Sequence, residues 1–201
     1  PLVKLKVAKK DTAVILTVKE KPPVKKKKKT IYLSFDDGPN KGTQNVLDII
    51  NKEEIVATLF VVGEHVYGSR QQAALFDSIC SSHFVEIANH SYTHAFHNRF
   101  AKFYTVPDSV VKDFERCADS LGLGSNIVRT PGRNIWRLKN IQQTDISNSH
   151  AAADSLQNKG FSIMGWDLEW FYNNQLQATQ TSEEMASQVD SMFIHNLTKT
   201  P

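Results

Sequence analysis

The 201-residue chain is predicted to adopt an α/β fold with a largely parallel sheet. Two observations predict this fold. From residue 31 onwards, short apolar runs typical of buried strands alternate with amphipathic helical segments, and polar residues suited to chemistry directly follow those runs. Right-handed crossovers between parallel strands bring their carboxyl ends to one edge of the sheet, where function gathers in such proteins.

The first thirty residues differ from the rest of the chain. Residues 2–20 alternate apolar and basic side chains around a Lys-Lys-Asp-Thr turn, which is typical of two short strands. Two strands alone are marginally stable, so we expect residues 1–20 to end a preceding β-rich domain. Two prolines and a lysine run predict a linker over residues 21–30. The chain begins at Pro1 without a leader, and we expect it to be a piece of a longer protein.

Charge is divided unevenly between these parts. Residues 1–30 carry eleven lysines and two acidic residues, a net charge of +9, whereas residues 31–201 carry 13 basic and 19 acidic residues, a net charge of −6. No aromatic side chains lie between the lysines of residues 25–29 to stack on bases, so we expect a solvated linker and no nucleic-acid partner. No segment approaches the roughly 20 apolar residues that cross a bilayer, and no membrane span is expected.

The remaining elements follow from local patterns. Strands are expected at residues 31–36, 57–62, 84–88, 126–129 and 161–166. Helices are expected near residues 43–53, 70–81, 108–121 and 147–158, and from residue 182 onwards. Gly122 ends the third helix, and Thr181 and Glu184 have the spacing of a capping box at the start of the last. Cys80 and Cys117 each lie in a predicted helix without a second thiol nearby, so both are expected to be free and partly buried.

Two adjacent carboxylates, Asp36 and Asp37, end the first strand and precede a Gly-Pro turn. Neighbouring carboxylates repel, so the pair is costly unless a cation lies between them or one of them holds a proton. The strand at residues 84–88 runs into His90 and His94, whose spacing would place both imidazoles on one side of a helical turn. Such a histidine pair often only decorates a surface helix. Its position after a buried strand favours a metal site, because one carboxylate and two imidazoles leave open positions on a divalent ion.

Five segments of residues 31–201 together resemble the polysaccharide deacetylase family, also called the NodB-homology domain or carbohydrate esterase family 4. Residues 34–39 (SFDDGP) resemble the family's first motif, TFDDGP, and residues 57–63 (ATLFVVG) resemble its second strand. Residues 90–94 (HSYTH) are similar to H-[ST]-x-x-H, and residues 129–132 (RTPG) to R-x-P-[FY]-G. Residues 166–170 (WDLEW) resemble the fourth motif, which carries tryptophan and aspartate. The resemblance implies a distorted, incomplete (β/α) barrel over residues 31–201.

The activity implied by the resemblance is metal-dependent deacetylation of an N-acetylated or O-acetylated polysaccharide, a hydrolysis of carbon–nitrogen bonds other than peptide bonds. Asp36 would be the general base and metal-bound water the nucleophile. Asp37, His90 and His94 would bind a divalent metal, with Zn²⁺ preferred and Co²⁺ or Ni²⁺ open. Such substrates imply an extracytoplasmic location: periplasmic, at the cell surface or secreted.

Further roles come from the third and fourth motifs. Arg129 would orient Asp36 by way of a fourth-motif acid, for which Asp167 is preferred over Glu169. Pro131 and Gly132 would contact substrate, and the backbone N–H of Gly132 would stabilise the oxyanion. Gly132 stands where the family often has an aromatic residue, so one wall of the substrate groove is missing or is supplied elsewhere, by Trp136, Trp166 or Trp170.

The general acid is left unassigned. The family ends with a strand carrying L-x-H, and Ile194-His195 imitates it, although Met185, Val189 and Met192 continue a helical face through this point. We therefore expect His195 to lie in the last helix and the family's acid to lie beyond Pro201.

Two other functions remain open at this stage: a catalytically silent, glycan-binding homologue, and a different metallohydrolase such as a phosphoesterase. The glycan, among peptidoglycan, chitin oligomers, poly-N-acetylglucosamine and xylan, and the oligomeric state are also open.

Overall fold

The computed structural model describes residues 4–5, 16–17, 29–175 and 177–198. Contacts along the chain divide it into two units, Pro1–Thr30 and Ile31–Pro201. In the first unit, β1 (Lys4–Leu5) pairs antiparallel with β2 (Leu16–Thr17), which are the two strands expected there. The predicted turn between them and most of the predicted linker lie outside the described residues.

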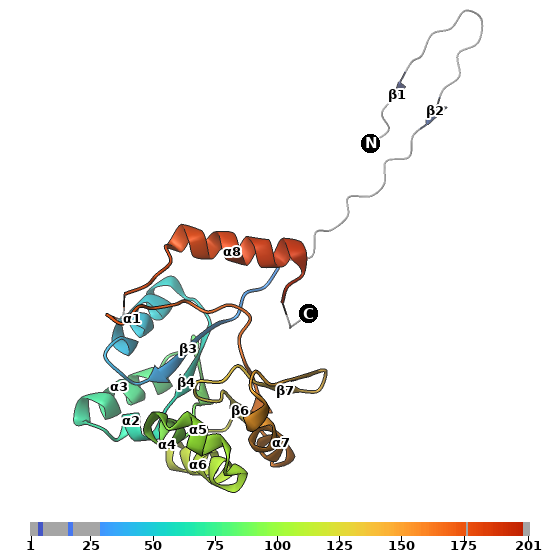
Figure 1. Ribbon diagram of the computed structural model, residues 1–201. Helices are drawn as coiled ribbons and strands as arrows, with labels where there is room; N and C mark the ends of the chain where they lie inside the picture. The colour runs from blue at the N-terminus through green and yellow to red at the C-terminus, as the bar shows by residue number, and fades with distance from the viewer. Residues whose placement is uncertain (1–3, 6–15, 18–28, 176, 199–201) are drawn as a thin grey trace, which may run out of the picture. The chain divides into compact units, whose positions relative to one another are not determined.

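A seven-stranded sheet forms the centre of the second unit, with strand order β3-β4-β5-β6-β9-β7-β8 (Figure 1). Its five parallel strands are those that the sequence predicts: β3 (Leu33–Gly38), β4 (Ala57–Val61), β5 (Val85–Asn89), β6 (Ile127–Val128) and β9 (Ser162–Ile163). An antiparallel hairpin of β7 (Trp136–Leu138) and β8 (Ile141–Gln143) extends the sheet beyond β9 and was not predicted. Among the described strands the sheet does not close, since β3 and β8 are its edges, which agrees with an incomplete barrel.

The register between β3 and β4 changes at the two adjacent carboxylates. Phe35 pairs with Leu59 and Gly38 pairs with Val61, so two residues of β3 lie opposite one residue of β4. Such a bulge re-aims side chains next to it. Asp36 and Asp37 are the two bulged residues, and Asp37 has a left-handed backbone with φ of 68°.

The five longer helices correspond to those predicted: α1 (Thr43–Glu53), α3 (Arg70–Cys80), α6 (Pro107–Leu121), α7 (His150–Asn158) and α8 (Ser182–His195). Three helices of four or five residues were not predicted: α2 (Gly63–Val66), α4 (His94–Asn98) and α5 (Phe100–Tyr104). A 3-10 turn, η1 (Ser147–Ser149), forms the start of the helix predicted over residues 147–158. Gly122 ends α6 in a left-handed conformation, as expected. The capping box of α8 is confirmed: the Glu184 N–H donates to Thr181 Oγ1 (3.2 Å) and the Thr181 N–H to Glu184 Oε2 (2.8 Å).

Two apolar clusters hold the helices on the sheet. One joins α1 and α3 to β4 through Leu47, Leu59, Val61, Leu75 and Ile79. The other joins α4, α5, α6 and α7 to β6 and β9, with Phe103, Phe114, Leu156 and Ile163 fully buried. Both cysteines are free as predicted, with Cys117 buried and Cys80 exposed rather than partly buried.

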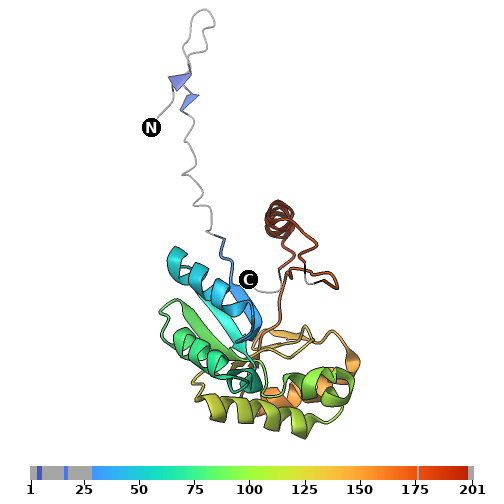
Figure 2. The ribbon, with the colours of Figure 1, turned by 90° about the vertical axis from the view of Figure 1, so that its left-hand side faces the viewer.

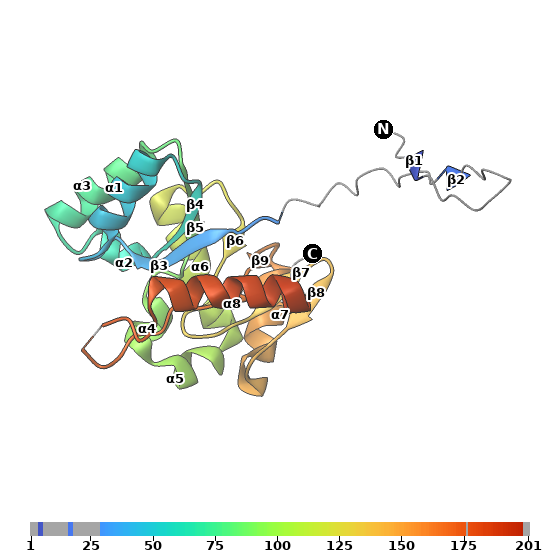
Figure 3. The ribbon, with the colours of Figure 1, turned by 90° about the horizontal axis from the view of Figure 1, so that it is seen from above.

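Helix α8 packs more loosely than the others. None of its residues is buried, although Met185, Val189, Met192 and Phe193 are half-buried. Figures 1 and 2 show α8 set apart from the helices that cover the sheet, and in the view from above it runs across the domain (Figure 3). No helix in the described part of the chain is both long and apolar enough to pass through a bilayer.

Candidate metal centre

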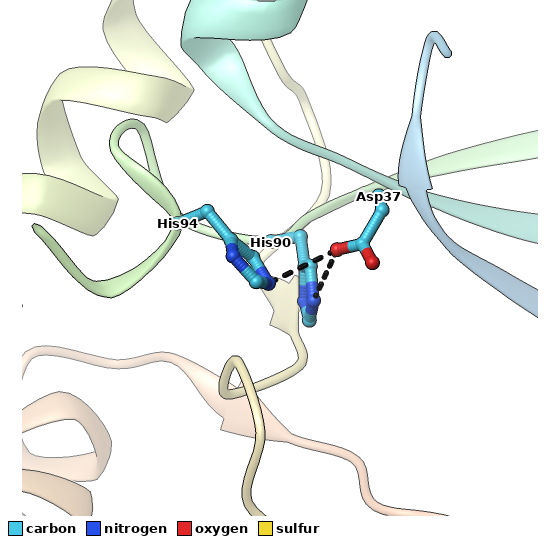
Figure 4. A group of neighbouring side chains, drawn as sticks. All are labelled: Asp37, His90 and His94. Carbon is cyan, nitrogen blue, oxygen red and sulfur yellow. Dashed lines mark ion pairs between the residues drawn. The ribbon is translucent and has the colours of Figure 1, made fainter. Parts of the chain in front are cut away.

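Three polar side chains meet beyond the carboxyl ends of β3 and β5 (Figure 4). Oδ1 of Asp37 lies 3.3 Å from Nε2 of His90 and 3.0 Å from Nε2 of His94. The sheet aligns these segments, because the His90 N–H donates to the carbonyl of Val61 (2.9 Å) and the Arg129 N–H to that of Asn89 (2.9 Å). Among the described residues, one group of three potential metal ligands has all its ligand atoms within 4.8 Å of one another, and it consists of Asp37, His90 and His94.

The backbone of Asp37 is held in its left-handed conformation by its neighbours. Its carbonyl oxygen accepts from Nδ2 of Asn40 (3.1 Å) and lies 2.8 Å from Nδ1 of His65. Nothing in the sequence marks out His65, because its partner is a backbone atom 28 positions away. These contacts fix the direction in which the Asp37 carboxylate leaves the bulge.

The segment that carries the two histidines is not the helical turn that we predicted. Ser91 has φ of 67°, and the residues from His94 to Asn98 all have φ between 47° and 66°. The turn of α4 is therefore left-handed, which costs non-glycine residues roughly 1–2 kcal/mol each. The two imidazoles converge on Asp37, but they do so through this irregular loop and not through regular i, i+4 spacing.

Asp113 of α6 anchors that loop. Its buried Oδ2 accepts from the N–H of Thr93 (3.1 Å) and from Thr93 Oγ1 (3.1 Å), and its carbonyl accepts from the N–H of Tyr92 (3.2 Å). Burial raises the pKa of Asp113, and the hydrogen bonds from Thr93 offset only part of that rise. The Tyr92 ring lies between Gly63, where a Cβ would come within 2.4 Å of it, and Arg116, whose guanidinium carbon is 3.5 Å from the ring centroid.

Hydrogen bonds also fix the proton positions of the two imidazoles. Nδ1 of His90 lies 2.9 Å from the carbonyl oxygen of Arg129, which can only accept, so Nδ1 carries the proton in the neutral ring. Nδ1 of His94 makes a short contact with Oδ1 of Asn98, with the same consequence. Both Nε2 atoms then present lone pairs to Asp37. Oδ1 of Asp37 is buried without a hydrogen-bond donor, so three acceptor atoms face one another as metal ligands do.

The electrostatics of the cluster favour a cation. Burial alone would raise the pKa of Asp37, but without an ion the hydrogen bonds and charge of protonated imidazoles at positions 90 and 94 hold it well below its usual range, and a bound cation would take the place of those protons. Burial alone would lower the pKa of His94, but Asp37 raises it above its ordinary value. Asp37 is thus a carboxylate near neutral pH, and the residues present fit a divalent ion.

Asp36 faces a different partner. Nη1 of the buried Arg129 donates to Oδ1 of Asp36 (2.9 Å) and to Oγ of Ser34 (2.8 Å). The guanidinium also donates from Nε to the carbonyl of Met164 (3.1 Å) and from Nη2 to that of Gly165 (2.9 Å). Arg129 therefore contacts Asp36 directly, and not by way of a fourth-motif acid as we expected.

One fourth-motif acid acts electrostatically on Arg129. Burial lowers the pKa of Arg129, and the charges of Asp36 and Glu169 offset part of that effect. Glu169, the less favoured choice, is thus the fourth-motif acid whose charge acts on Arg129. The role of Asp167 stays a prediction.

The third motif forms a tight turn beside the metal ligands. Gly132 has φ of 62°, and the carbonyl of Pro131 accepts from the hydroxyl of Tyr104 (2.7 Å). A Cβ on Gly132 would lie 2.9 Å from Cε1 of Phe100. Nothing in the local sequence pattern relates Phe100 to a glycine 32 positions later.

The three tryptophans differ in exposure. Trp136 is 3% exposed within β7, which makes it part of the core and removes it as a groove wall. Trp166 is half-buried, with its backbone N–H and carbonyl bonded to the side chain of Asn134 (3.1 and 2.9 Å). Trp170 is 39% exposed, and its Nε1 donates to the carbonyl of Gln180 (3.3 Å). Trp166 and Trp170 both remain accessible.

His195 lies in the last turn of α8, as predicted, and is exposed. Asn196 then ends the helix in a left-handed conformation with φ of 52°. In the described part of the chain, no hydrogen bond or ion pair joins His195 to Asp36, Asp37 or the two clustered histidines.

A model of the polysaccharide deacetylase family matches residues 23–133 of the chain. Over 186 residues, the chain is 26% identical to the putative polysaccharide deacetylase YheN of Bacillus subtilis, covering 86% of this chain and 60% of that protein. Over 181 residues, it is 26% identical to a peptidoglycan-N-acetylglucosamine deacetylase of Bacillus cereus, covering 87% and 58%. A chitin disaccharide deacetylase of Vibrio alginolyticus is 27% identical, covering 73% and 48%. The chain thus spans about half to three fifths of the length of these relatives.

Solved structures share the fold. A carbohydrate esterase family 4 esterase of Streptococcus mutans superposes with a TM-score of 0.56 at 18% identity, covering 80% of this chain and 66% of that one. The catalytic domain of a peptidoglycan N-acetylglucosamine deacetylase of Eubacterium rectale gives a TM-score of 0.53 at 22% identity, covering 80% and 70%. These likenesses support the incomplete barrel described above.

Proposed function

Because the chain belongs to the polysaccharide deacetylase family, we propose that it removes acetyl groups from an N-acetylated polysaccharide by metal-dependent hydrolysis. The observation that carries this proposal is the cluster of three acceptor atoms on Asp37, His90 and His94, next to a second carboxylate, Asp36, that is held separately. Such a division provides one carboxylate to hold a cation and another to move a proton.

Asp37, His90 and His94 would hold the ion. A divalent ion bound there supplies Lewis-acid polarisation of the acetyl carbonyl and lowers the pKa of water to about 7. Zn²⁺ is our first choice for this ligand set, with Co²⁺ and Ni²⁺ as alternatives.

We assign Asp36 as the general base. Its Oδ1 accepts from Arg129, so Oδ2 is the oxygen that takes the proton from the attacking water. Arg129 is itself fixed by the carbonyls of Met164 and Gly165, which limits the positions that the Asp36 carboxylate can adopt. A base held in one orientation needs less reorganisation when the substrate reacts.

The tetrahedral oxyanion would accept a hydrogen bond from the N–H of Gly132, on the turn after Arg129. Collapse of the intermediate then needs a proton on the leaving amine nitrogen. Among the residues assigned above, Asp36 can donate this proton once it is protonated. The proton that Asp36 removes from water can therefore pass to the amine.

The proposed substrates are N-acetylated glycans, with peptidoglycan and chitin oligomers as the first to test. The Bacillus cereus relative is a peptidoglycan-N-acetylglucosamine deacetylase and the Vibrio alginolyticus relative is a chitin disaccharide deacetylase. Because glycans of this class imply an extracytoplasmic location, we also propose that location for this chain.

The test measures acetate release from N-acetylglucosamine oligomers and from peptidoglycan fragments, with Zn²⁺ added and after chelation. We expect release that depends on the metal, and a loss of about 100- to 10,000-fold in Asp36→Asn. Asp119→Asn, an exposed carboxylate on α6, is the matched control and should keep full activity. Bound metal without acetate release from any glycan would favour a silent glycan-binding protein. Hydrolysis of phosphate esters in place of acetyl groups would favour a phosphoesterase.

A further inference from the structure

The ring of Phe100 occupies the space into which a side chain at position 132 would project. An ideal Cβ on Gly132 would lie 2.9 Å from Cε1, 3.1 Å from Cδ1 and 3.2 Å from Cζ of that ring. The shortest of these separations is closer than carbon atoms approach in proteins. The aromatic ring at position 100 and a side chain at position 132 therefore exclude each other.

Phe100 also borders the metal centre. Its ring centroid lies 5.8 Å from that of His94, and the two planes meet at 86°. The guanidinium carbon of Arg133 lies 5.9 Å from the centroid of the same ring. Phe100 thus contacts a proposed metal ligand on one side and the third-motif turn on another.

The exposure of Phe100 distinguishes it from its neighbour on α5. Phe103 is completely buried in the apolar cluster, whereas Phe100 is half-buried at the edge of that cluster. Phe100 is packed against the core, contacts His94 and stays partly exposed. A ring held in this way is a rigid apolar surface next to the proposed reaction centre.

Sugar rings present an apolar C–H face as well as hydroxyl groups, and binding sites combine aromatic surfaces with a few directed polar groups. We propose that Phe100 forms the apolar wall of the substrate groove, contacting the C–H face of the sugar whose acetyl group reaches the metal centre. The Phe100 ring occupies the space that a side chain at residue 132 would otherwise fill. This inference rests on the proposed deacetylase function and adds a residue that determines glycan binding.

The test compares a glycan substrate with one that has no sugar ring. Michaelis parameters of Phe100→Ala and Phe100→Leu are measured on an N-acetylglucosamine tetramer and on 4-nitrophenyl acetate, with zinc content determined in parallel. We expect KM for the tetramer to rise about tenfold, while zinc content and the rate on the small ester change less than about twofold. Phe100→Tyr, which restores an aromatic face, should return KM for the tetramer to near its original value.

The matched control is Phe161→Ala. Phe161 is also half-buried on the same apolar cluster, but it directly precedes β9 and its ring centroid lies 6.3 Å from that of Phe114. This variant should lower the unfolding temperature without changing KM for the tetramer. Phe100→Leu keeps most of the buried apolar volume, so it remains informative where Phe100→Ala does not fold.

The outcomes separate the inference from the function on which it rests. An active chain whose Phe100 variants keep the original KM, or lose activity equally on both substrates, overturns the role of Phe100 alone. A chain that releases no acetate counts against the proposed function. In that case calorimetric binding of the tetramer decides the inference: a tenfold weaker Kd in Phe100→Leu supports it, and an unchanged Kd or no binding overturns it.

Discussion

The carbonyl oxygen of Arg129 lies 2.9 Å from Nδ1 of His90. The guanidinium of the same arginine lies 2.9 Å from Oδ1 of Asp36. One residue therefore sets the tautomer of a proposed metal ligand with its backbone and orients the proposed base with its side chain. Because the two contacts come from different parts of the residue, substitution can separate them.

Arg129→Lys should impair the base and spare the metal. Lysine keeps the positive charge but cannot reproduce the fork of donors that reaches Asp36, Ser34 and two carbonyls. We expect the rate of acetate release to fall about 100-fold, as is typical when a reacting group is misplaced. Zinc affinity, measured by competition with a chromophoric chelator, should stay within about twofold, because the carbonyl that binds His90 remains. Zinc lost together with activity would show that the two contacts are not separable.

Gly63→Ala should disturb the histidine loop. A Cβ at this position would lie 2.4 Å from Cδ2 of Tyr92, whose ring is also covered by Arg116. Overpacking of this kind costs about 1–3 kcal/mol, measured as the free energy of unfolding in urea. Zinc affinity should fall as well, since Tyr92 lies between the two histidine ligands.

Gly124→Ala is the matched control for that variant. A Cβ on Gly124 meets no atom within 4 Å, so neither stability nor zinc affinity should change by a comparable amount. Equal effects at positions 63 and 124 would contradict the packing explanation.

Asp113 makes stability depend on pH. Its pKa is raised above the ordinary value of 3.8, mainly by burial, so the folded state binds this proton more tightly than the unfolded state. The stabilisation from this proton is fully present below pH 3.8 and is lost as the pH rises through the folded pKa. Asp113→Asn should therefore gain stability relative to the parent, measured as a larger free energy of unfolding, as the pH rises from about 3 to 7. A difference that does not vary with pH would contradict the burial argument.

Asp113→Ala should weaken metal binding. It leaves the N–H and hydroxyl of Thr93 without their acceptor, in the loop between His90 and His94. We expect zinc affinity to fall about 10- to 100-fold, the usual effect of removing a group that orients metal ligands. Asp113→Asn, which can still accept through its amide oxygen, should recover most of that loss. Equal zinc affinity in Asp113→Ala and Asp113→Asn would contradict the role of Asp113 in positioning the histidine loop.

Much of the fold could be predicted because its elements are signalled locally. The alternation of apolar strands with amphipathic helices predicted the parallel strands and the longer helices, and the capping box at Thr181 marked the start of α8. The hairpin of β7 and β8 escaped prediction because charged or amide side chains interrupt both segments (WRL and IQQ), so neither shows an apolar run.

The candidate site could be predicted only in part, for a related reason. Asp37 lies at the carboxyl end of β3 and His90 directly follows β5, so the predicted parallel strands were enough to bring these two to the same edge of the sheet. The left-handed turn depends on Asp113, some twenty residues further along the chain, and on the packing of Tyr92. Contacts over such distances leave no periodic signal in a single sequence.

The central claim is that the adjacent carboxylates have different tasks, and zinc binding tests it most directly. Zinc stoichiometry and affinity are measured by equilibrium dialysis for the parent chain, Asp36→Asn and Asp37→Asn. We predict one zinc per chain for the parent and for Asp36→Asn, and an affinity lower by at least about 100-fold for Asp37→Asn, since even residues behind the ligands contribute 10- to 100-fold. Zinc affinity lost equally in both variants, or lost in Asp36→Asn alone, would contradict the account.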